Sequence, residues 1–366
     1  MVIATIERIS GAVLAPITGY RKSEAGTLIQ DSAIYYSNGL LCETSLHIAS
    51  SPQHLNVPGP FPSRVARQIQ GTHIYGGILI GHFGHFIVEG LSRLWAVRRE
   101  PPVKSIVFVR GLGIPLLNQR HAIPDYAAEL FGLLGLGAPV ALHDGPVQFE
   151  QLCVPTQLFG YHCMRGHPLF HSFVHKLRQV CRRSEFVSSK LYVSRSKLEG
   201  NVTGGILCES VIEDNLTRYG YGIFHPQDFS IDEQIGLYNH ARQLIFAEGS
   251  AIHLFGLVAR QSQKIALIRR RGINAFPIEQ LGGFARCGVS DLNCIKNYYL
   301  HANTSTCEVD FAELGKELER LEFIPHRRFW RTPTRAELAQ QAETLGIELR
   351  NDEPRQANQG ATVVRD

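Results

Sequence analysis

The stretch that decides the fold runs from residue 232 to residue 271 and reads DEQIGLYNHARQLIFAEGSAIHLFGLVARQSQKIALIRRR. Apolar residues recur at helical spacing over 235–241 and again over 252–258. The runs 244–247 and 265–268 are short and continuously apolar, which is typical of buried strands. The predicted order is therefore helix, strand, tight turn, helix and strand, the pattern of a doubly wound α/β domain.

The turn after the first of these strands is the chemically informative part. Gly249 allows a backbone to approach a ligand closely, and Ser250 is expected to cap the helix that follows. A helix N-terminus presents unpaired N–H groups and a positive dipole end, so an anionic phosphate could bind there. Many turns of this form bind nothing, and an ordinary strand-to-helix connection remains the alternative.

Composition limits the classes of function. The chain has 366 residues, of which 44% are hydrophobic and 19% charged, and this predicts a globular protein of two domains. The net charge of +4 is mild, and no Lys/Arg block interleaves with aromatic residues, so nucleic acid is not an expected partner. The eight cysteines form no C-x-x-C pair, which favours reduced thiols in the cytoplasm.

No targeting segment is evident, and no apolar run reaches the roughly 20 residues that a membrane span needs. A cytoplasmic protein is the simplest interpretation. Peripheral attachment to the inner face of the membrane through a few basic residues stays open, and the oligomeric state is not indicated.

The most distinctive stretch of the amino-terminal half is GHFGHFIVEGLSRLW at 81–95. If 82–95 is one helix, His82, His85 and Glu89 fall on one face. They could be hydrogen-bonding groups at a domain face, an acid/base and substrate-binding face, or a metal site. The spacing matches neither H-E-x-x-H nor its inverse, which disfavours the metal.

The remaining patterns extend the α/β prediction to the whole chain. The loop 162–171 is rich in histidine, but the irregular spacing favours a linker or binding-site lining over a metal site. Residues 311–323 form an amphipathic pattern expected to dock on the body, 334–345 could be a helix, and the last dozen residues are expected to be disordered. Strands are expected at 105–109, 140–142, 152–155, 190–195 and 221–224, and helices at 126–136, 173–181 and 211–219.

The chain contains, in order, YVSR at 192–195, an acidic helix start around Glu213, FSIDEQ at 229–234, and AEGSAIHLF at 247–255. Together, these motifs resemble glycosyltransferase family 61. The upstream GHFGHFIVE is similar to that family's H-F-x-x-[DE] element, so the resemblance covers roughly residues 75–270. One departure is Phe246, which stands where the family usually has the first glycine of the turn.

The resemblance implies a GT-B fold, in which two Rossmann-like domains face each other across a cleft. It divides the chain into an acceptor-side domain at 1–160 and a nucleotide-sugar domain at 161–300. A helical segment at 301–330 and a polar tail at 331–366 follow. The implied enzyme is an inverting transferase that moves a sugar from a nucleotide-sugar, expected to be a UDP-sugar, to a glycan or other hydroxyl acceptor in bacterial surface polysaccharide synthesis. No cofactor is implied.

An inverting transfer needs a base for the acceptor hydroxyl, and Glu89 or His85 is the candidate, with His82 on the acceptor side. The departing diphosphate gains negative charge. The sequence has no D-x-D, so Arg195 and the helix start at Gly249 are expected to stabilise that charge without a metal.

The assignment of other residues to the expected donor site rests on fewer observations. Glu213 and Glu248 could accept ribose or sugar hydroxyls, and Ser250 and His253 complete the donor-binding set. Two alternatives stay open: Arg195 could be a structural ion-pair partner, and Glu213 could simply be a first-turn acid favoured by the helix dipole.

Two other classes of function remain. A nonenzymatic sugar-nucleotide or carbohydrate-binding protein would keep the turn and Arg195 but lack a base. A metal-dependent hydrolase would use His82, His85 and Glu89. An NAD enzyme is disfavoured because no G-x-G-x-x-G follows an early strand, and a serine hydrolase because Ser250 lacks the G-x-S-x-G elbow.

Overall fold

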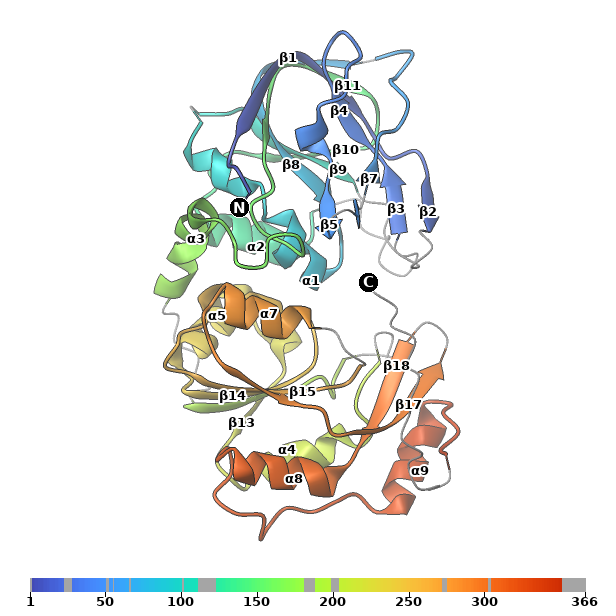
Figure 1. The fold of residues 1–366 in the computed structure, drawn as a ribbon, viewed down its shortest axis with the longest axis vertical. Coiled ribbons are helices and arrows are strands. Elements are labelled where there is room, and N and C mark those ends of the chain that lie inside the picture. The colour runs from blue at the N-terminus through green and yellow to red at the C-terminus, as the bar shows by residue number, and fades with distance from the viewer. Residues whose placement is uncertain are drawn as a thin grey trace. The chain divides into compact units, whose positions relative to one another are not determined.

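The chain consists of two compact units, the first ending at Gln179 and the second beginning at Val180 (Figure 1). The computed structural model describes residues 2–22, 28–50, 53–54, 56–65, 67–100, 102–110, 123–180, 188–198, 204–271, 275–301 and 304–350. Residues 161–179, assigned above to the second domain, pack with the first unit. The ring of Phe170 stacks on that of Phe159 with their centroids 4.8 Å apart, and the guanidinium of Arg98 lies over the ring of Phe173.

The first unit is rich in strands. Its strands are β1 (Ile6–Ala15), β2 (Tyr20–Lys22), β3 (Leu28–Asp31), β4 (Ala33–Tyr35), β5 (Ile48–Ser50), β6 (Gln53–His54), β7 (Asn56–Val57), β8 (Arg67–Leu79), β9 (Ser105–Arg110), β10 (Val140–His143) and β11 (Val147–Pro155). Its helical segments are η1 (Glu43–Ser45), α1 (Phe83–His85), η2 (Phe86–Gly90), η3 (Leu94–Arg98), α2 (Asp125–Leu133), α3 (Pro168–Val174) and η5 (His175–Gln179).

The main sheet of this unit is mixed. Its strand order is β10-β9-β8-β11-β1-β4. The strands β10, β9, β8 and β11 run parallel to one another, whereas β1 is antiparallel to both β11 and β4. Helix α2 lies in the connection from β9 to β10, as parallel neighbours require a crossover. The unit is α/β in its parallel half, but the antiparallel β1 and β4 distinguish it from a fully parallel doubly wound sheet.

The expectation of one α-helix over 82–95 is wrong. The segment divides into the short α1, the π-helical turn η2 and, after three turn residues, the 3₁₀ helix η3. In η2 the N–H of Leu91 donates to the carbonyl of Phe86, five residues back, at 3.2 Å. A Cβ added to Gly90 would come within 2.7 Å of the Phe86 ring, so glycine permits this wider turn. Single π-helical turns of this kind are frequent at functional sites.

The second unit contains the stretch 232–271. Its strands are β12 (Lys190–Val193), β13 (Gly222–Phe224), β14 (Gln243–Ala247), β15 (Lys264–Ile268), β16 (Val289–Leu292), β17 (Ile295–His301) and β18 (Thr304–Val309). Its helices are α4 (Glu209–Thr217), η7 (Pro226–Asp228), α5 (Ile231–His240), α6 (Ala251–Val258), α7 (Phe276–Gly283), α8 (Phe311–Arg320) and α9 (Arg335–Thr344). The predicted order helix, strand, turn, helix, strand is confirmed by α5, β14, α6 and β15.

The five-stranded sheet of the second unit is entirely parallel and doubly wound, and β17 and β18 form a separate antiparallel pair. The order β13-β12-β14-β15-β16 corresponds to 2-1-3-4-5 within the unit. Helices α5 and α7 cover one face, and α4 and α8 cover the other (Figure 1). The order reverses between β12 and β14, and ligands of open α/β sheets bind at the carboxyl ends of the strands at such a point.

Aromatic packing explains how α5 and α6 are seated on β14. The ring of Phe255 lies 5.0 Å from that of Phe246 and 5.5 Å from that of Tyr238, measured between centroids. All three side chains are buried. The apolar run of the strand and the apolar stripes of both helices therefore meet in one core, as their spacing in the sequence predicted.

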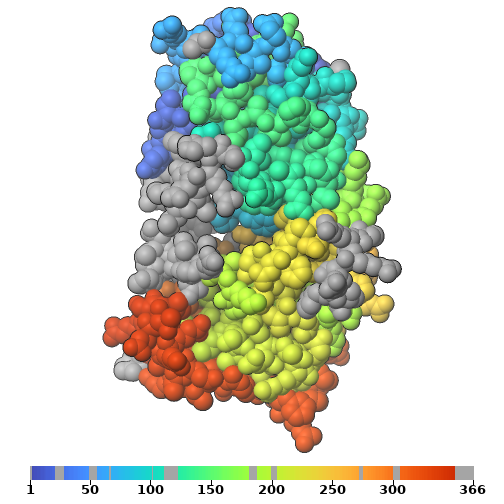
Figure 2. All heavy atoms as spheres, turned by 180° about the vertical axis from the view of Figure 1, so that it is seen from behind, coloured from blue at the N-terminus to red at the C-terminus, as the bar shows by residue number. Residues whose placement is uncertain are grey.

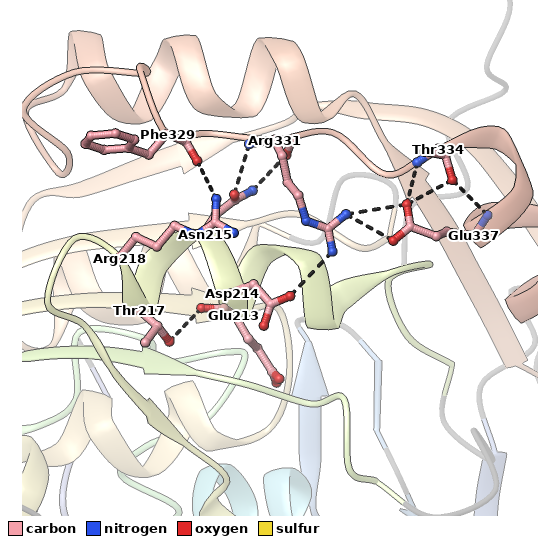
Figure 3. A network of polar contacts seen from close by, with 9 residues as sticks. All are labelled: Glu213, Asp214, Asn215, Thr217, Arg218, Phe329, Arg331, Thr334 and Glu337. Atoms are coloured by element: carbon pink, nitrogen blue, oxygen red, sulfur yellow. Dashed lines mark hydrogen bonds and ion pairs between the residues drawn. The ribbon is translucent and has the colours of Figure 1, made fainter.

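The segment 321–345 forms a C-terminal arm that packs against α4 (Figure 3). Asn215 exchanges two hydrogen bonds with the backbone of Arg331, at 2.8 and 3.0 Å. The Arg331 guanidinium lies 3.0 Å from Glu337 and 3.4 Å from Asp214. Figure 2 shows the arm (red) lying against the yellow-green surface of the same unit. Helix α9 confirms the helix expected at 334–345, and Thr334 and Glu337 form its capping box.

Other local expectations have mixed outcomes. The amphipathic stripe of 311–323 is confirmed by α8, where Leu314 and Leu318 are buried. The helix expected at 173–181 becomes the end of α3 followed by the 3₁₀ turn η5, and its last residue lies outside the described residues. The tail beyond residue 350, expected to be disordered, also lies outside them.

Candidate functional site

Two loops leave neighbouring strands at the switch point of the second unit. Ser194 and Arg195 follow β12, and the turn that contains Gly249 follows β14, whose Phe246 is paired with Val193. Because the strands are parallel, both loops emerge at the same edge of the sheet. A Cβ added to Gly249 would lie 2.4 Å from Nη1 of Arg195 and 2.9 Å from its Cδ. The structure therefore brings these two predicted donor-site residues into direct contact.

Arg195 belongs to a small basic cluster with Arg270 and Arg271, which follow β15. Burial lowers the pKa of Arg195, and the neighbouring Arg271 lowers it further, whereas Glu209 and Glu248 oppose this change. Burial also lowers the pKa of Arg270 to about 9, with added repulsion from Arg195 and Arg271. Three guanidinium groups thus lie close enough to repel one another.

Glu248 is a structural member of this cluster. Its Oε2 accepts hydrogen bonds from the backbone N–H groups of Arg270 (2.9 Å) and Arg271 (3.0 Å). Its Oε1 lies 3.6 Å from Nε of Arg271. The carboxylate is buried and joins the turn after β14 to the end of β15. It holds the basic residues in place by these contacts.

Sequence reasoning missed Glu209, the first residue of α4. Its Oε1 accepts three hydrogen bonds, from the hydroxyls of Tyr192 (2.9 Å) and Ser194 (3.0 Å) and from the N–H of Arg195 (2.8 Å). Burial raises its pKa, and these bonds act in the opposite direction. The helix had been expected to begin at Val211, so this buried acid fell outside the pattern. The only indication of this acid in the sequence is its position, two residues before the apolar pair at 211–212 with which the predicted helix begins.

Glu213 binds the loop after β12. Its Oε1 accepts a hydrogen bond from the hydroxyl of Ser196 (2.5 Å) and lies 2.6 Å from that of Ser194, whose single proton is shared with Glu209; Nε2 of His225 lies 3.8 Å away. Since α4 begins at Glu209, Glu213 is not in the first turn, and the alternative role as a first-turn acid does not apply. Glu209 and Glu213 together fix the serines on either side of Arg195.

The other two predicted residues on this edge behave differently. Ser250 occupies the position before α6 but makes no side-chain capping hydrogen bond, and its helical backbone conformation differs from that of an ordinary cap. The expected cap is therefore wrong. His253 is held by α7: its Nδ1 lies 2.8 Å from Oε1 of Gln280, whose Nε2 donates to the His253 carbonyl at 3.1 Å.

In the first unit, the structure pairs two of the predicted side chains of the 82–95 segment. Nδ1 of His85 lies 2.9 Å from Oε2 of Glu89. The imidazole is 43% exposed, whereas the carboxylate is 1% exposed. The His82 ring meets the His85 ring edge-on, with centroids 5.1 Å apart. A buried acid thus orients an accessible imidazole.

The histidines of the loop 162–171 bind the backbone. Nε2 of His162 lies 3.2 Å from the Gln157 carbonyl, and His167 accepts from the N–H of Leu169, which caps α3. Nε2 of His171 lies 2.8 Å from the Arg165 carbonyl. Across the described part of the chain, no three His, Cys, Asp or Glu side chains are grouped so that they could hold a metal ion.

None of the helices among the described residues is both long enough and apolar enough to cross a membrane. No curated protein matched the chain.

The family model described as Glycosyltransferase 61 matches residues 83–264. The match begins beside His85, runs through the Arg195 and Gly249 loops, and ends at the first residue of β15. It therefore includes both the imidazole–carboxylate pair of the first unit and the switch point of the second. Residues 83–264 of this chain are therefore similar to glycosyltransferase family 61.

Proposed function

We propose that the protein is an inverting glycosyltransferase of GT-B type that moves a sugar from a nucleotide-sugar, a UDP-sugar, to a hydroxyl of a glycan acceptor. The second unit binds the donor and the first unit supplies the base and the acceptor site. The observation that carries this proposal is the contact of Arg195 with Gly249 at the point where the strand order reverses. A binding site at this edge fits the general rule for open parallel sheets.

The basic cluster suits a departing diphosphate. Arg195, Arg270 and Arg271 repel one another, and an anionic ligand would relieve that repulsion. Positively charged groups that are held in place before the reaction stabilise charge that develops in the transition state. Glu209 binds the backbone of Arg195, and Glu248 binds the backbones of Arg270 and Arg271. The three arginines therefore need little rearrangement when the diphosphate departs. With no D-x-D in the sequence, these cations supply the charge that a metal would otherwise provide.

The base is the exposed imidazole of His85, oriented by the buried Glu89. The acceptor oxygen attacks the anomeric carbon while its proton passes to Nε2 of His85. The bond from that carbon to the diphosphate breaks, and the nucleoside diphosphate leaves with the electron pair, so the configuration inverts. Glu89 holds Nδ1–H and stabilises the imidazolium that forms, as a carboxylate does in other acid–imidazole pairs. His82 lies beside the imidazole and contacts the acceptor.

We propose a cytoplasmic location at the inner face of the membrane and a role in bacterial surface polysaccharide synthesis. The eight cysteines of the sequence form no C-x-x-C pair, which fits a reducing compartment.

The test is a transfer assay with a panel of UDP-sugars and glycan acceptors, with product stereochemistry read by NMR. Wild-type protein should give inverted product, Arg195→Ala should raise the donor KM, and His85→Ala should lower kcat. A protein that binds a UDP-sugar tightly but transfers nothing to any acceptor would be a binding module. No binding of any nucleotide up to millimolar concentration would refute the donor site.

A further inference from the structure

The sheet edge that carries Arg195 continues on its other side to β13. Strand β13 lies next to β12, with Phe224 paired with Val193, and His225 is the first residue after β13. Because the two strands are parallel, the loops that follow them emerge side by side. Glu213 reaches the same place from α4, and its Oε1 lies 3.8 Å from Nε2 of His225. An acid and an imidazole therefore meet at this part of the edge.

Glu213 uses only one of its two carboxylate oxygens. Its Oε1 accepts a hydrogen bond from the Ser196 hydroxyl at 2.5 Å and lies 2.6 Å from that of Ser194. No residue that the structure describes donates to Oε2. The side chain is 17% exposed, so a ligand in solution can reach this carboxylate. Figure 3 shows that Glu213 points away from Arg331 of the C-terminal arm.

His225 presents a hydrogen-bond donor to the same place. Its Nδ1 has no partner among the described residues, and the 3.8 Å from Nε2 to Glu213 is too long for a hydrogen bond. Burial lowers the pKa of His225, so the ring is neutral near neutral pH. The negative charge of Glu213 beside Nε2 favours the tautomer with the proton on that nitrogen. The imidazole thus offers an unused N–H next to an unused carboxylate oxygen.

The loop after β13 is held in place on both sides of the histidine. The N–H of Ser194 donates to the carbonyl of Phe224 at 2.9 Å. The side-chain amide of Gln234 in α5 donates to the carbonyls of Pro226 (2.8 Å) and Phe229 (3.1 Å). The donor and the acceptor are therefore fixed before a ligand arrives, which lowers the cost of ordering the site on binding.

Sugar hydroxyls match these two groups. A hydroxyl has one donor position and two acceptor positions, so it can donate to a carboxylate and accept from an imidazole N–H. Two neighbouring hydroxyls on one ring can use Oε2 of Glu213 and Nε2 of His225 together. A phosphate does not suit this place, because its charge and that of Glu213 repel each other. The chemistry here differs from that of the basic cluster on the other side of the loop.

The position of the pair relative to the basic cluster fits a single ligand. Arg195 contacts Gly249 on the β14 side of the loop after β12, whereas Glu213 and His225 lie on its β13 side. Neighbouring strands are about 4.8 Å apart. A nucleotide-sugar has a sugar ring at each end of its diphosphate. When the diphosphate occupies the basic cluster, one of these rings can reach the pair.

We propose that Glu213 and His225 form a hydroxyl-binding subsite that holds two neighbouring hydroxyls on a sugar ring of the donor. The inference rests on the proposed function and adds His225, which the sequence did not single out. Glu213 accepts a hydrogen bond from one hydroxyl, His225 donates to the other, and Ser196 orients Glu213. Both the ribose and the transferred sugar carry such hydroxyls, and the experiment separates these two sources.

The experiment measures the binding of four ligands by isothermal titration. They are UDP, 2′-deoxy-UDP, 3′-deoxy-UDP and the UDP-sugar that the transfer assay selects. His225→Phe keeps a ring and removes its hydrogen bonds, and His225→Gln keeps a donor. The control is Asp228→Asn, because Asp228 lies in the same loop and its side chain is half exposed. Melting temperatures show whether each variant is folded.

The two sources give different patterns. If the ribose is held, wild-type protein should bind UDP about 10-fold more tightly than at least one deoxy analogue, and His225→Phe should abolish this preference. If the transferred sugar is held, the deoxy analogues should bind like UDP, and His225→Phe should weaken binding of the UDP-sugar alone, about 10-fold. In both cases His225→Gln should restore part of the effect, and Asp228→Asn should behave like wild type.

Two results would overturn the subsite. One is a folded His225→Phe protein with wild-type affinity for all four ligands, and the other is an equal loss of affinity for all four, because a hydroxyl contact must depend on the hydroxyl. If His225→Phe does not fold, Glu213→Gln replaces it, with the same patterns expected and the same two results decisive. Wild-type protein that does not bind UDP would refute the donor site together with this subsite. Wild-type protein that binds UDP, both deoxy analogues and the UDP-sugar equally would overturn the subsite alone.

Discussion

Replacing Gly249 with alanine should weaken donor binding while leaving the fold intact. The new Cβ would lie 2.4 Å from Nη1 of Arg195, whereas ordinary contact begins at 3.4 Å. The guanidinium must therefore withdraw by about 1.0 Å (3.4 − 2.4). Gly249 is not among the glycines with a left-handed backbone, so alanine adds no backbone strain there. The perturbation acts on the position of one side chain.

The magnitude follows from hydrogen-bond geometry. A displacement of about 1 Å lengthens a bond of about 2.9 Å to about 3.9 Å, which is outside hydrogen-bonding range. A hydrogen bond to a charged group contributes about 1.5–3 kcal/mol. The loss of one such bond to the diphosphate corresponds to a Kd about 10–150-fold higher for UDP.

The assay is isothermal titration of UDP into folded protein, with melting temperature as the check on the fold. Gly282→Ala is the matched control, because an added Cβ there meets nothing within 4 Å. A double-mutant cycle sharpens the test: in an Arg195→Ala background, Gly249→Ala should have almost no further effect. Wild-type affinity for UDP in folded Gly249→Ala protein, or full additivity with Arg195→Ala, would refute the reasoning.

Four further outcomes are expected. Glu89→Gln should lower kcat about 10²–10⁴-fold with UDP affinity unchanged, and an unaltered kcat in folded protein would remove Glu89 from the mechanism. Asn215→Ala should lower the free energy of unfolding by about 1–3 kcal/mol in urea denaturation, because it leaves the backbone groups of Arg331 without their partners. Transfer should survive EDTA, because arginine side chains and not a metal ion are proposed to stabilise the diphosphate. Activity that is lost in EDTA and restored by manganese would contradict this metal-free site. Burial lowers the pKa of His47 from 6.5 to about 4. As the pH falls, His47 is therefore protonated in the unfolded chain at a higher pH than in the folded protein. The free energy of unfolding should fall by about 3 kcal/mol between pH 6.5 and 4, and His47→Gln should lack that part of the loss.

Local periodicity was sufficient to predict the elements of the second unit. The apolar run of β14 and the stripes of α5 and α6 needed only neighbours along the chain, because their spacing reflects one buried face each. The same reasoning failed over 82–95. There the contact of Gly90 with the Phe86 ring permits a π-helical turn, and such a contact leaves no trace in periodicity.

The candidate site was predicted in part. The sequence pointed to Arg195 and Gly249 separately, but their contact depends on β12 and β14 being neighbours, and strand order is not a local property. Glu209 escaped notice because its role is to bind the loop after β12, which a helix pattern cannot reveal.

By itself, the sequence determined the α/β class, the position of the phosphate-compatible turn and the presence of His85 and Glu89, four residues apart, on one face of a helical segment. These depend on interactions between residues close together in the chain. Only the tertiary structure decided which loops share an edge of the sheet, and that the imidazole is exposed while the carboxylate is buried. It also brought the side chains of His47 and Arg93, forty-six residues apart in the chain (93 − 47), to the same face of Gly77. The physical reason is that burial and charge proximity between distant segments arise only when the chain has closed its sheets and packed its core.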